Sequence, residues 1–381
     1  MPFIPCSQAE IVVRCPVPIR SSEGGGSMRE LRAEEIEALA VGAWILGTGG
    51  GGSPYHGLLN MRRLYREGVR VRLIGPQALA DDDNVAVVSN MGAPLVTQER
   101  LTDSGMIARA VKVMQEYLGR RFRAVMGIEI GGGNSIQPLM AAAHLGIPVI
   151  DADAMGRAYP EAQMTSFAVG GLAPAPLVSV DPRGNEVIVT GATNWKWMER
   201  TSRKVCTEFG SIAATCKAPR TGAEVKRWGI PMTMTKAIRL GHAVIEANRS
   251  HQDPIEAILK AEHGKQLFAG KIIEVERRTT EGFLRGRTWI QGQGRDRIRI
   301  DFQNEWIVVW SEGNPLASTP ELICVLDSDT GEAIGTEMIR YGQRVTVIVL
   351  PSPEIFLTPR GLEHVGPRAF GYDIDFCSVF A

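Results

Sequence analysis

Three acidic side chains stand beside apolar, strand-like runs and are the first candidates for chemistry. Glu129 interrupts one such run, and Asp151 and Asp153 directly follow another. Because an unpaired charge in a buried strand is costly, we expect Glu129 to face a cleft, a cation or an arginine such as Arg157. Neighbouring carboxylates can hold a hard cation, or raise one another's pKa and so supply a general base. The alternative is structural, with Asp151 capping the next turn and Asp153 paired with Arg157.

Two glycine-rich stretches could bring the backbone close to a ligand. The first, Gly47–Gly52, follows a helix-like segment and lacks the GK[ST] ending, so it fits neither a dinucleotide fingerprint nor a Walker loop. It is either a helix–helix turn or a nest of N–H groups that accepts an anion. The second stretch, Gly131–Gly133, separates a predicted strand from a predicted helix. In open α/β sheets, ligands bind at such strand ends. The candidate binding residues here are Gly49, Gly50, Gly51, His56, Gly132, Gly133 and Asn134.

Cys216 is the candidate nucleophile of the second half of the chain. Lys217 and Arg220 would favour its thiolate if all three side chains pointed the same way, and Thr221 extends this polar run. The alternative is an ordinary core cysteine. The substrate-binding candidates also include Asp151, Arg157, Lys217, Arg220 and Thr221. Glu161 and Gln163 extend the polar lining. The histidines show no metal-binding spacing, but a divalent metal at Glu129, Asp151 and Asp153 stays open.

Helices and short apolar strands alternate up to about residue 150, which predicts an α/β domain with a mainly parallel sheet. Apolar residues recur with helical spacing over 34–46 and 107–118. Beyond residue 150 the pattern mixes strands and helices. We expect strands at 167–169, 177–180 and 186–190, and helices after Trp195 and near 235–248 and 254. Beyond Leu267 we expect strands and no helix, which is an all-β module.

Three segments follow from this pattern. Residues 1–27 are rich in proline, serine and glycine and precede Met28, so we interpret them as a disordered extension or a misplaced start. Residues 28–195 form the predicted α/β domain. Residues 196–381 form the second domain, a helical segment followed by the β-rich module.

The composition of the 381 residues excludes several classes of partner. Forty-two basic residues balance forty-two acidic ones, which gives no general attraction to nucleic acid or anionic membranes. No apolar run approaches the roughly 20 residues of a membrane helix. The six cysteines are scattered without a CxxC pair, so neither a zinc site nor a disulfide scaffold is expected. A cytoplasmic protein is the simplest interpretation.

Several motifs, in order along the chain, resemble the S-methyl thiohydantoin desulfurase family. The resemblance extends from about Leu31 to the C-terminus and implies an α/β domain followed by a mostly β region. It implies hydrolysis of an S-methylated thiohydantoin with a propionate arm to a hydantoin and methanethiol, in the breakdown of ergothioneine-type sulfur compounds. The motifs are Leu46–Gly52, Met91–Pro94, Glu129–Gly132, Asp151–Ala158, Phe302–Glu305 and Gly366–Tyr372.

The resemblance does not assign catalytic residues, so those named here follow from the residue types. Cys216 would attack the ring carbon and form a covalent thioimidate, or Asp153 or Glu129 would activate water directly. Neither route needs a cofactor. Two other functions stay open: an accessory subunit that binds a hydantoinase- or oxoprolinase-type protein, and a nucleotide- or metal-dependent enzyme. A homo-oligomer is compatible with the size of the chain.

Overall fold

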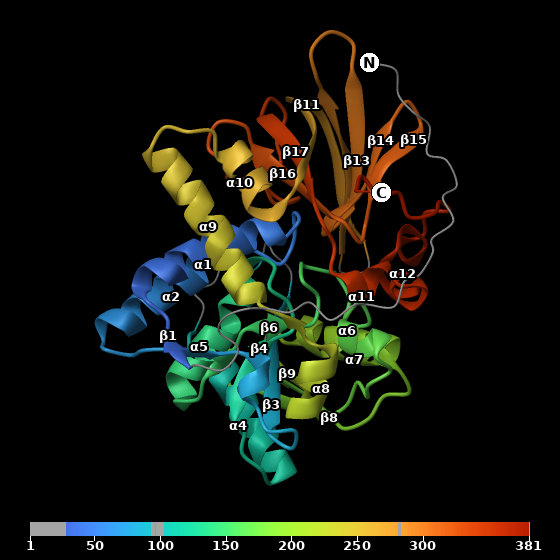
Figure 1. The fold of residues 1–381 in the computed structure, drawn as a ribbon. Coiled ribbons are helices and arrows are strands. Elements are labelled where there is room, and N and C mark those ends of the chain that lie inside the picture. Colours follow the sequence, from blue (N-terminus) through green and yellow to red (C-terminus); the bar gives the residue numbers. More distant parts are fainter. Residues whose placement is uncertain (1–27, 93–95, 97–102, 281–282, 381) are drawn as a thin grey trace.

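A computed structural model describes residues 28–92, 96, 103–280 and 283–380 (Figure 1). The predicted extension 1–27 lies outside these residues. The chain forms an α/β part and an antiparallel β part, with helices α1 (Ala33–Leu46) and α9 (Thr233–Arg249) beside both. These two helices cross closely, because Gly42 and Gly241 each lie against the backbone of the other helix. The predicted α/β domain followed by a β module is confirmed.

The first sheet has eight strands, and its centre is the parallel block β2-β5-β4-β3. Strand β9, which follows residue 195, continues the sheet antiparallel to β3 and is flanked by β7. The sheet therefore draws a strand from beyond the predicted boundary. In sheet order the strands are β1 (Arg29–Glu30), β2 (Arg72–Ile74), β5 (Val149–Ile150), β4 (Ala124–Gly127), β3 (Asn84–Gly92), β9 (Ile212–Thr221), β7 (Leu177–Val180) and β8 (Glu186–Val189).

Helices cover both faces of this sheet, and alternate residues of its strands enter different cores. In β3, Ala86 and Val88 pack with the helices of one face, whereas Val85 and Val87 pack on the other. The first face carries α1, α2 (Tyr55–Arg66), α4 (Met106–Leu118) and α5 (Gln137–Leu145). The second carries α6 (Ser166–Val169), α8 (Gly222–Trp228) and the start of α7 (Trp195–Glu208). The predicted helices over 34–46 and 107–118 are confirmed.

The strand predicted at 167–169 is wrong, because these residues form the short helix α6. Thr165 caps that helix, its hydroxyl accepting a hydrogen bond from the Ala168 amide at 3.2 Å. Phe167 is fully buried in the core of the second face. A short apolar run cannot by itself distinguish a buried strand from a buried helical turn.

The second sheet is antiparallel and has seven strands in the order β15-β14-β13-β12-β11-β17-β16. Helix α10 (Pro254–Glu262) precedes it. The strands are β11 (Lys265–Thr280), β12 (Phe283–Gln291), β13 (Arg297–Gln303), β14 (Glu305–Ser311), β15 (Asn314–Ser318), β16 (Leu322–Asp327) and β17 (Arg344–Leu350).

The expectation that no helix follows Leu267 is wrong, because α11 (Glu354–Leu357) and α12 (Pro359–Val365) follow strand β17. Both are too short to show a helical period. Thr358 caps α12 with proline at its first turn, which is the one signal that the sequence offers.

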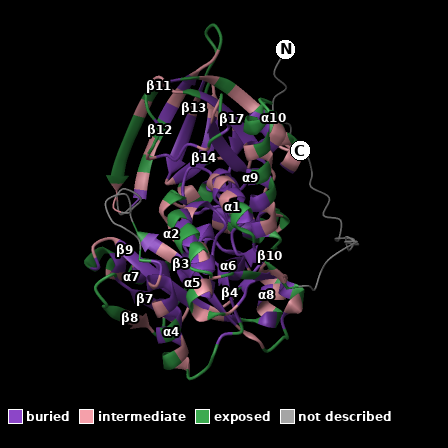
Figure 2. Ribbon diagram, turned by 90° about the vertical axis from the view of Figure 1, so that its left-hand side faces the viewer, coloured by how far each residue is buried: buried purple, intermediate pink, exposed green. Residues whose placement is uncertain are grey.

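Strand β16 joins the two parts through its two faces. Leu322 and Cys324 pack with the helices around α1, whereas Ile323 and Val325 enter the core of the second sheet. In Figure 2 the buried residues gather along the strands and on the inward faces of the helices. A two-stranded ribbon, β6 (Ala152–Asp153) with β10 (Ile230–Pro231), completes the fold. Among the residues described, no helix is both long and apolar enough to cross a membrane.

Candidate functional site

A cavity of about 530 Å³ lies at the carboxyl ends of the parallel strands β3 and β4, the edge at which the sequence predicts a site. Strand β9, the loop after α1, helix α7 and the start of β14 complete its walls, so both parts of the chain contribute. Of the predicted site residues, the cavity brings together Gly51, His56, Glu129, Gly133, Asn134, Lys217 and Glu161.

Glu129 follows β4 and is held by two donors. Its Oε1 accepts a 2.5 Å hydrogen bond from the Asn134 side-chain amide, and its Oε2 accepts one of 3.3 Å from the Tyr159 backbone. Asn134 is itself fixed, because its Oδ1 accepts from the Asn90 amide at 2.7 Å. The carboxyl group is therefore buried and oriented at the cavity wall.

Burial raises the pKa of Glu129 to about 7, although Asn134, the Tyr159 amide and the charge of Lys217 act in the opposite direction. A carboxyl with such a pKa exchanges its proton near neutral pH, which suits a general base. Glu129 thus combines the position and the proton affinity that this role requires.

Lys217 is the buried cation of the cavity. Among the described residues its ammonium has no hydrogen-bond or ion-pair partner, and burial lowers its pKa while Glu199 and Glu129 raise it. Glu199 is already engaged, because Arg203 Nε donates to it at 2.7 Å and the Ala162 amide at 3.1 Å. Lys217 is therefore available to an anionic group of a ligand.

The two glycine stretches are packed against each other. The Gly133 amide donates to the carbonyls of Gly52 and Gly51 at 2.8 and 3.1 Å, and a side chain at Gly51 or Gly132 would overlap the opposite backbone. Gly49 lies against Trp306 instead. Close packing accounts for these glycines, so the predicted anion nest has no support at Gly49 or Gly132, neither of which lines the cavity.

Cys216 does not reach the cavity, although the next residue does. Successive side chains of a strand point to opposite faces, so with Lys217 at the cavity Cys216 enters the hydrophobic core. The thiol is fully buried, and this burial raises its pKa to about 12. The flanking cation does not yield a thiolate, and the position argues against the predicted nucleophile.

Asp153 lies behind Glu129 and outside the cavity lining. Its Oδ2 accepts hydrogen bonds from the amides of Ile130 and Gly156, at 2.7 and 2.8 Å. Burial raises its pKa to about 7. These contacts join the loop after Glu129 to the loop after β6. Asp153 therefore positions Glu129, and its location does not support the predicted role as a base.

Asp151 serves helix α9 rather than a ligand. Its Oδ1 accepts from the amides of Met234 and Thr235 at 2.9 and 3.1 Å, and the Thr235 hydroxyl donates to Oδ2. Asp151 thus has a capping role, as the structural alternative predicted. It caps the start of α9, about 80 residues further along the chain, and not the next turn. The predicted substrate contact is not seen.

Asp151→Ala is expected to destabilise the protein by about 1–2 kcal/mol, the usual cost of losing a helix cap. The rate of any reaction in the cavity, per folded molecule, should hardly change. Urea denaturation and a rate measurement on the same sample test this. A large loss of rate without a loss of stability would contradict it.

Arg157 is fully buried and hydrogen-bonded to oxygens from both parts of the chain. It donates to Thr48 Oγ1 at 2.6 Å, to the Glu321 carbonyl at 2.8 Å and to the Trp306 carbonyl at 3.3 Å. Its ring contact is with Tyr159, at 4.7 Å. The predicted partners Asp153 and Glu129 are not among these contacts, and the predicted role in substrate binding is replaced by a structural one.

Arg220 and Thr221 also have structural roles outside the cavity. Arg220 donates to the Ala173 carbonyl at 2.8 Å and stacks on Phe167. Thr221 caps α8 through a capping box with Glu224. Both side chains are used by the fold and neither lines the cavity, so the structure gives no support to their predicted role in substrate binding.

Comparison of the sequence with protein-family models identifies the family of the chain. A family model described as the S-Me-THD-like N-terminal domain matches residues 34–191, and one described as the S-Me-THD-like C-terminal domain matches residues 193–379. The chain belongs to the S-Me-THD-like family. The predicted resemblance is confirmed, and the cavity of this S-Me-THD-like protein lies where residues of both matched domains meet.

The S-Me-THD-like protein also matches a solved structure, a crystal structure of a protein from Chromobacterium violaceum. The TM-score is 0.77 at 22% identity, over 92% of this chain and 99% of that one. At this identity the likeness shows the fold alone. No curated protein matches the chain.

Sequence reasoning missed four charged cavity residues of the S-Me-THD-like protein: Glu199, Arg203, Glu305 and Glu332. Glu199 and Arg203 belong to helix α7, which carries many charged residues, so the sequence does not single them out. Glu305 stands directly before an apolar run, the same signal that singled out Glu129 and the aspartates, and it lies in a motif quoted for the resemblance.

The three predicted carboxylates do not form a metal site in the S-Me-THD-like protein. Asp151 accepts hydrogen bonds from the start of α9, whereas Asp153 accepts them from the amides of Ile130 and Gly156. Within the described ranges, no group of three or more His, Cys, Asp or Glu side chains is arranged to hold a metal ion.

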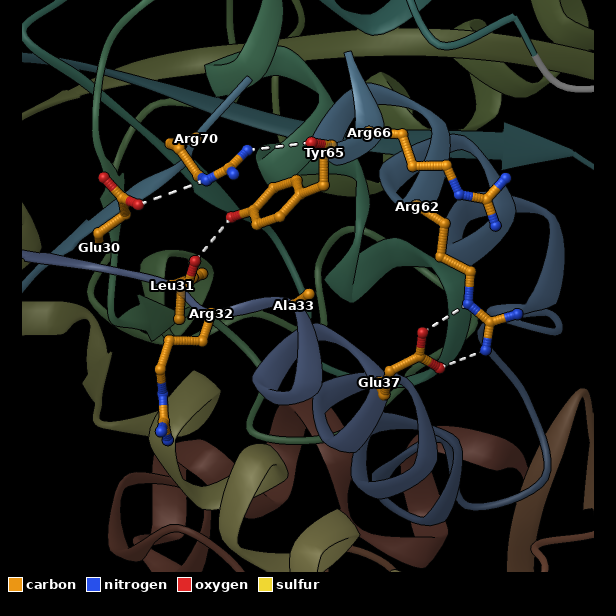
Figure 3. A pocket seen from close by; sticks show the side chains of 9 residues that line it. All are labelled: Glu30, Leu31, Arg32, Ala33, Glu37, Arg62, Tyr65, Arg66 and Arg70. Atoms are coloured by element: carbon orange, nitrogen blue, oxygen red, sulfur yellow. Dashed lines mark hydrogen bonds and ion pairs between the residues drawn. The ribbon is translucent and has the colours of Figure 1, made fainter. Parts of the chain in front are cut away.

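A second hollow of similar size lies at the surface beside α1, α2 and β1 (Figure 3). Two pairs of its charged side chains are in contact with each other. Arg62 contacts Glu37 at 2.5 Å, and Arg70 lies 3.6 Å from Glu30. These exposed pairs leave no buried or oriented group for chemistry, so the site is assigned to the cavity at the sheet edge.

Proposed function

We propose that the protein is a hydrolase of a cyclic thioimidate, converting an S-methyl thiohydantoin with a propionate arm to a hydantoin and methanethiol. One observation carries the proposal: an S-Me-THD-like chain places the buried, oriented carboxyl of Glu129 in a cavity with the buried cation Lys217. A volume of about 530 Å³ also suits a substituted five-membered ring.

Glu129 acts as the general base in this proposal. It takes a proton from a water molecule, whose oxygen bonds to the ring carbon that carries sulfur. The resulting tetrahedral centre collapses, the carbon–sulfur bond breaks, and the water oxygen becomes the new carbonyl. The two protons of water end on the ring nitrogen and on methanethiol. Asn134 keeps the Glu129 carboxyl oriented during the exchange.

Lys217 is the proposed partner of the substrate carboxylate. Within the described ranges its buried ammonium has no hydrogen-bond or ion-pair partner, and a buried ammonium attracts an anion more strongly than an exposed one does. This assignment needs neither a metal nor a cofactor. The packing of the glycine stretches removes the main observation in favour of nucleotide binding.

The pH dependence follows from the pKa of Glu129, which is about 7. A base must be unprotonated, so kcat/KM is expected to rise with pH and to level off above about 7, falling about tenfold per pH unit below that value. Initial rates of thiol release between pH 5 and 9 test this. A rate that is highest at pH 5 would contradict Glu129 as the base.

The test of the function is incubation of the purified protein with S-methyl thiohydantoin propionate, with and without chelator, while free thiol is measured. Release that survives chelation supports the proposal. Release lost with chelator would replace the direct base with a metal-dependent route. No release would favour a different substrate or an accessory role beside a hydantoinase-type protein.

A further inference from the structure

Glu305 is a further buried carboxyl of the cavity, beside Glu129 and Glu199, and it comes from the second part of the chain. Asn304 forms the tight turn between β13 and β14 in a left-handed conformation (φ 57°), and Glu305 is the first residue of β14. The side chain is 2% exposed and lines the cavity. Its Oε2 has no hydrogen-bond partner among the described residues. The fold therefore presents an unsatisfied carboxyl oxygen to the ligand.

We infer that Glu305 is the proton donor to the leaving sulfur in the reaction proposed above, on which this inference rests. Two carboxyls of the cavity then have complementary roles, Glu129 as base and Glu305 as acid. Such pairs arise where the environment sets two proton affinities apart. Glu305 is a catalytic residue in this scheme because it contacts the leaving group.

The surroundings of Glu305 favour its protonated form. Burial raises its pKa well above the ordinary value, and the nearby Glu129 charge raises it further, while Arg157 acts in the opposite direction. An unpartnered buried carboxylate would be costly, whereas the neutral acid loses less on burial and offers an O–H donor. Glu129, in contrast, already accepts two hydrogen bonds that favour its charged form.

The proton balance of the step is complete. As the tetrahedral centre collapses, the carbon–sulfur electron pair goes to sulfur, which takes the Glu305 proton and leaves as methanethiol. Glu305 is left as a carboxylate and regains a proton after product leaves, when the proton that Glu129 took from water is returned through solvent. The second proton of water, on the hydroxyl of the tetrahedral centre, goes to the ring nitrogen. Protonation of sulfur by Glu305 then makes the carbon–sulfur bond the one that breaks, so the ring stays closed.

The decisive experiment varies the leaving group in wild type, Glu305→Gln and Glu129→Gln. The probes are the S-methyl substrate and its S-(4-nitrophenyl) analogue, whose thiolate leaves without a proton. E305Q is expected to lose about a hundredfold or more in kcat on the S-methyl substrate and to stay within about tenfold of wild type on the aryl analogue. E129Q should be slow on both, because water still needs a base.

The matched control is Glu321→Gln. Glu321 is also a buried glutamate of the second part, but its carboxyl accepts from Val379 at 3.1 Å and from Ser378, and it does not line the cavity. E321Q should therefore show no dependence on the leaving group. A structural defect lowers both rates together, so the ratio of the two rates separates proton donation from misfolding.

Gly50→Ala provides a second route to the same group. The added methyl would overlap the Glu305 carboxyl and its neighbouring carbons, while the φ of Gly50 is not among the positive ones. The variant should displace Glu305 and show the same leaving-group pattern, even if E305Q does not fold.

The outcomes separate the two proposals. A wild type inactive on both probes overturns the proposed function and the inference with it. An active wild type, with E305Q and G50A slowed equally on both probes or not slowed at all, overturns the inference alone. Selective loss on the S-methyl substrate supports it.

Discussion

Glu129→Gln is expected to reduce thiol release by about a thousandfold, within the range for loss of a general base. The amide cannot take a proton from water, yet it has the same shape and can still accept the hydrogen bond from Asn134. Substrate binding should change little, so the loss appears in kcat. Steady-state kinetics with S-methyl thiohydantoin propionate at pH 8 measure it. Retention of a tenth or more of the rate would contradict the assignment.

Cys216→Ala is the matched control for this prediction. The cysteine was the candidate for covalent catalysis, but it is packed in the core behind the strand. The alanine variant should keep its rate within about threefold and lose roughly 1 kcal/mol of stability through the small cavity left behind. Loss of activity in folded C216A, or a trapped thioimidate adduct in the wild type, would restore the covalent route.

Stability gives Glu129→Gln an independent signature. The pKa of Glu129 is about 7 in the folded protein and near 4.5 in the unfolded chain, so the folded state binds the proton more tightly. That contribution is fully present below pH 4.5 and is lost as pH rises through 7. Glutamine carries no such charge. Removing the buried charge stabilises E129Q, and the loss of the weak hydrogen bond from the Tyr159 amide offsets part of this gain. E129Q should therefore be about 1–2 kcal/mol more stable than wild type at pH 8.

Comparison of unfolding free energies at pH 5 and pH 8 tests this sign. The advantage of E129Q should shrink or vanish at pH 5, where the wild-type carboxyl is protonated. An advantage that grows toward acid pH would mean that Glu129 is stabilised by its charge, and would weaken its role as a base.

Arg157→Lys is expected to lower the free energy of unfolding by about 3–5 kcal/mol, despite the conserved charge. The guanidinium reaches oxygens of Thr48, Trp306 and Glu321 at once, and no ammonium can match that fork. Lysine would leave buried carbonyls without donors. The glycine loop and the second sheet should loosen together.

Thermal and urea unfolding of R157K measure this loss. Because Arg157 joins both parts, the two should separate in stability, which would appear as a broader transition. A variant as stable as wild type with weakened substrate binding would return Arg157 to the binding role predicted from sequence.

The sequence identified the sheet edge but not every group that works there. The carboxyl ends of parallel strands meet at one edge, so Glu129 and Asn134 could be brought together from local pattern alone. Cys216 and Lys217 show the limit of this reasoning. A strand sends neighbours to opposite faces, and only the core packed behind β9 decides which one meets the cavity. Asp151 illustrates the same limit, because the helix that it caps could not be anticipated from its neighbours.

The sequence by itself determined the α/β part, the β module, the family and the sheet edge at which Glu129 lies, because these depend on periodicity and on motifs within short stretches. Tertiary structure alone decided the roles of the groups between the two parts. It placed Glu305 in the same cavity as Glu129, and it made Arg157 a link between the two parts. It also packed the two glycine stretches against each other's backbone. These roles depend on contacts between residues far apart in the chain, and local pattern carries no record of such contacts.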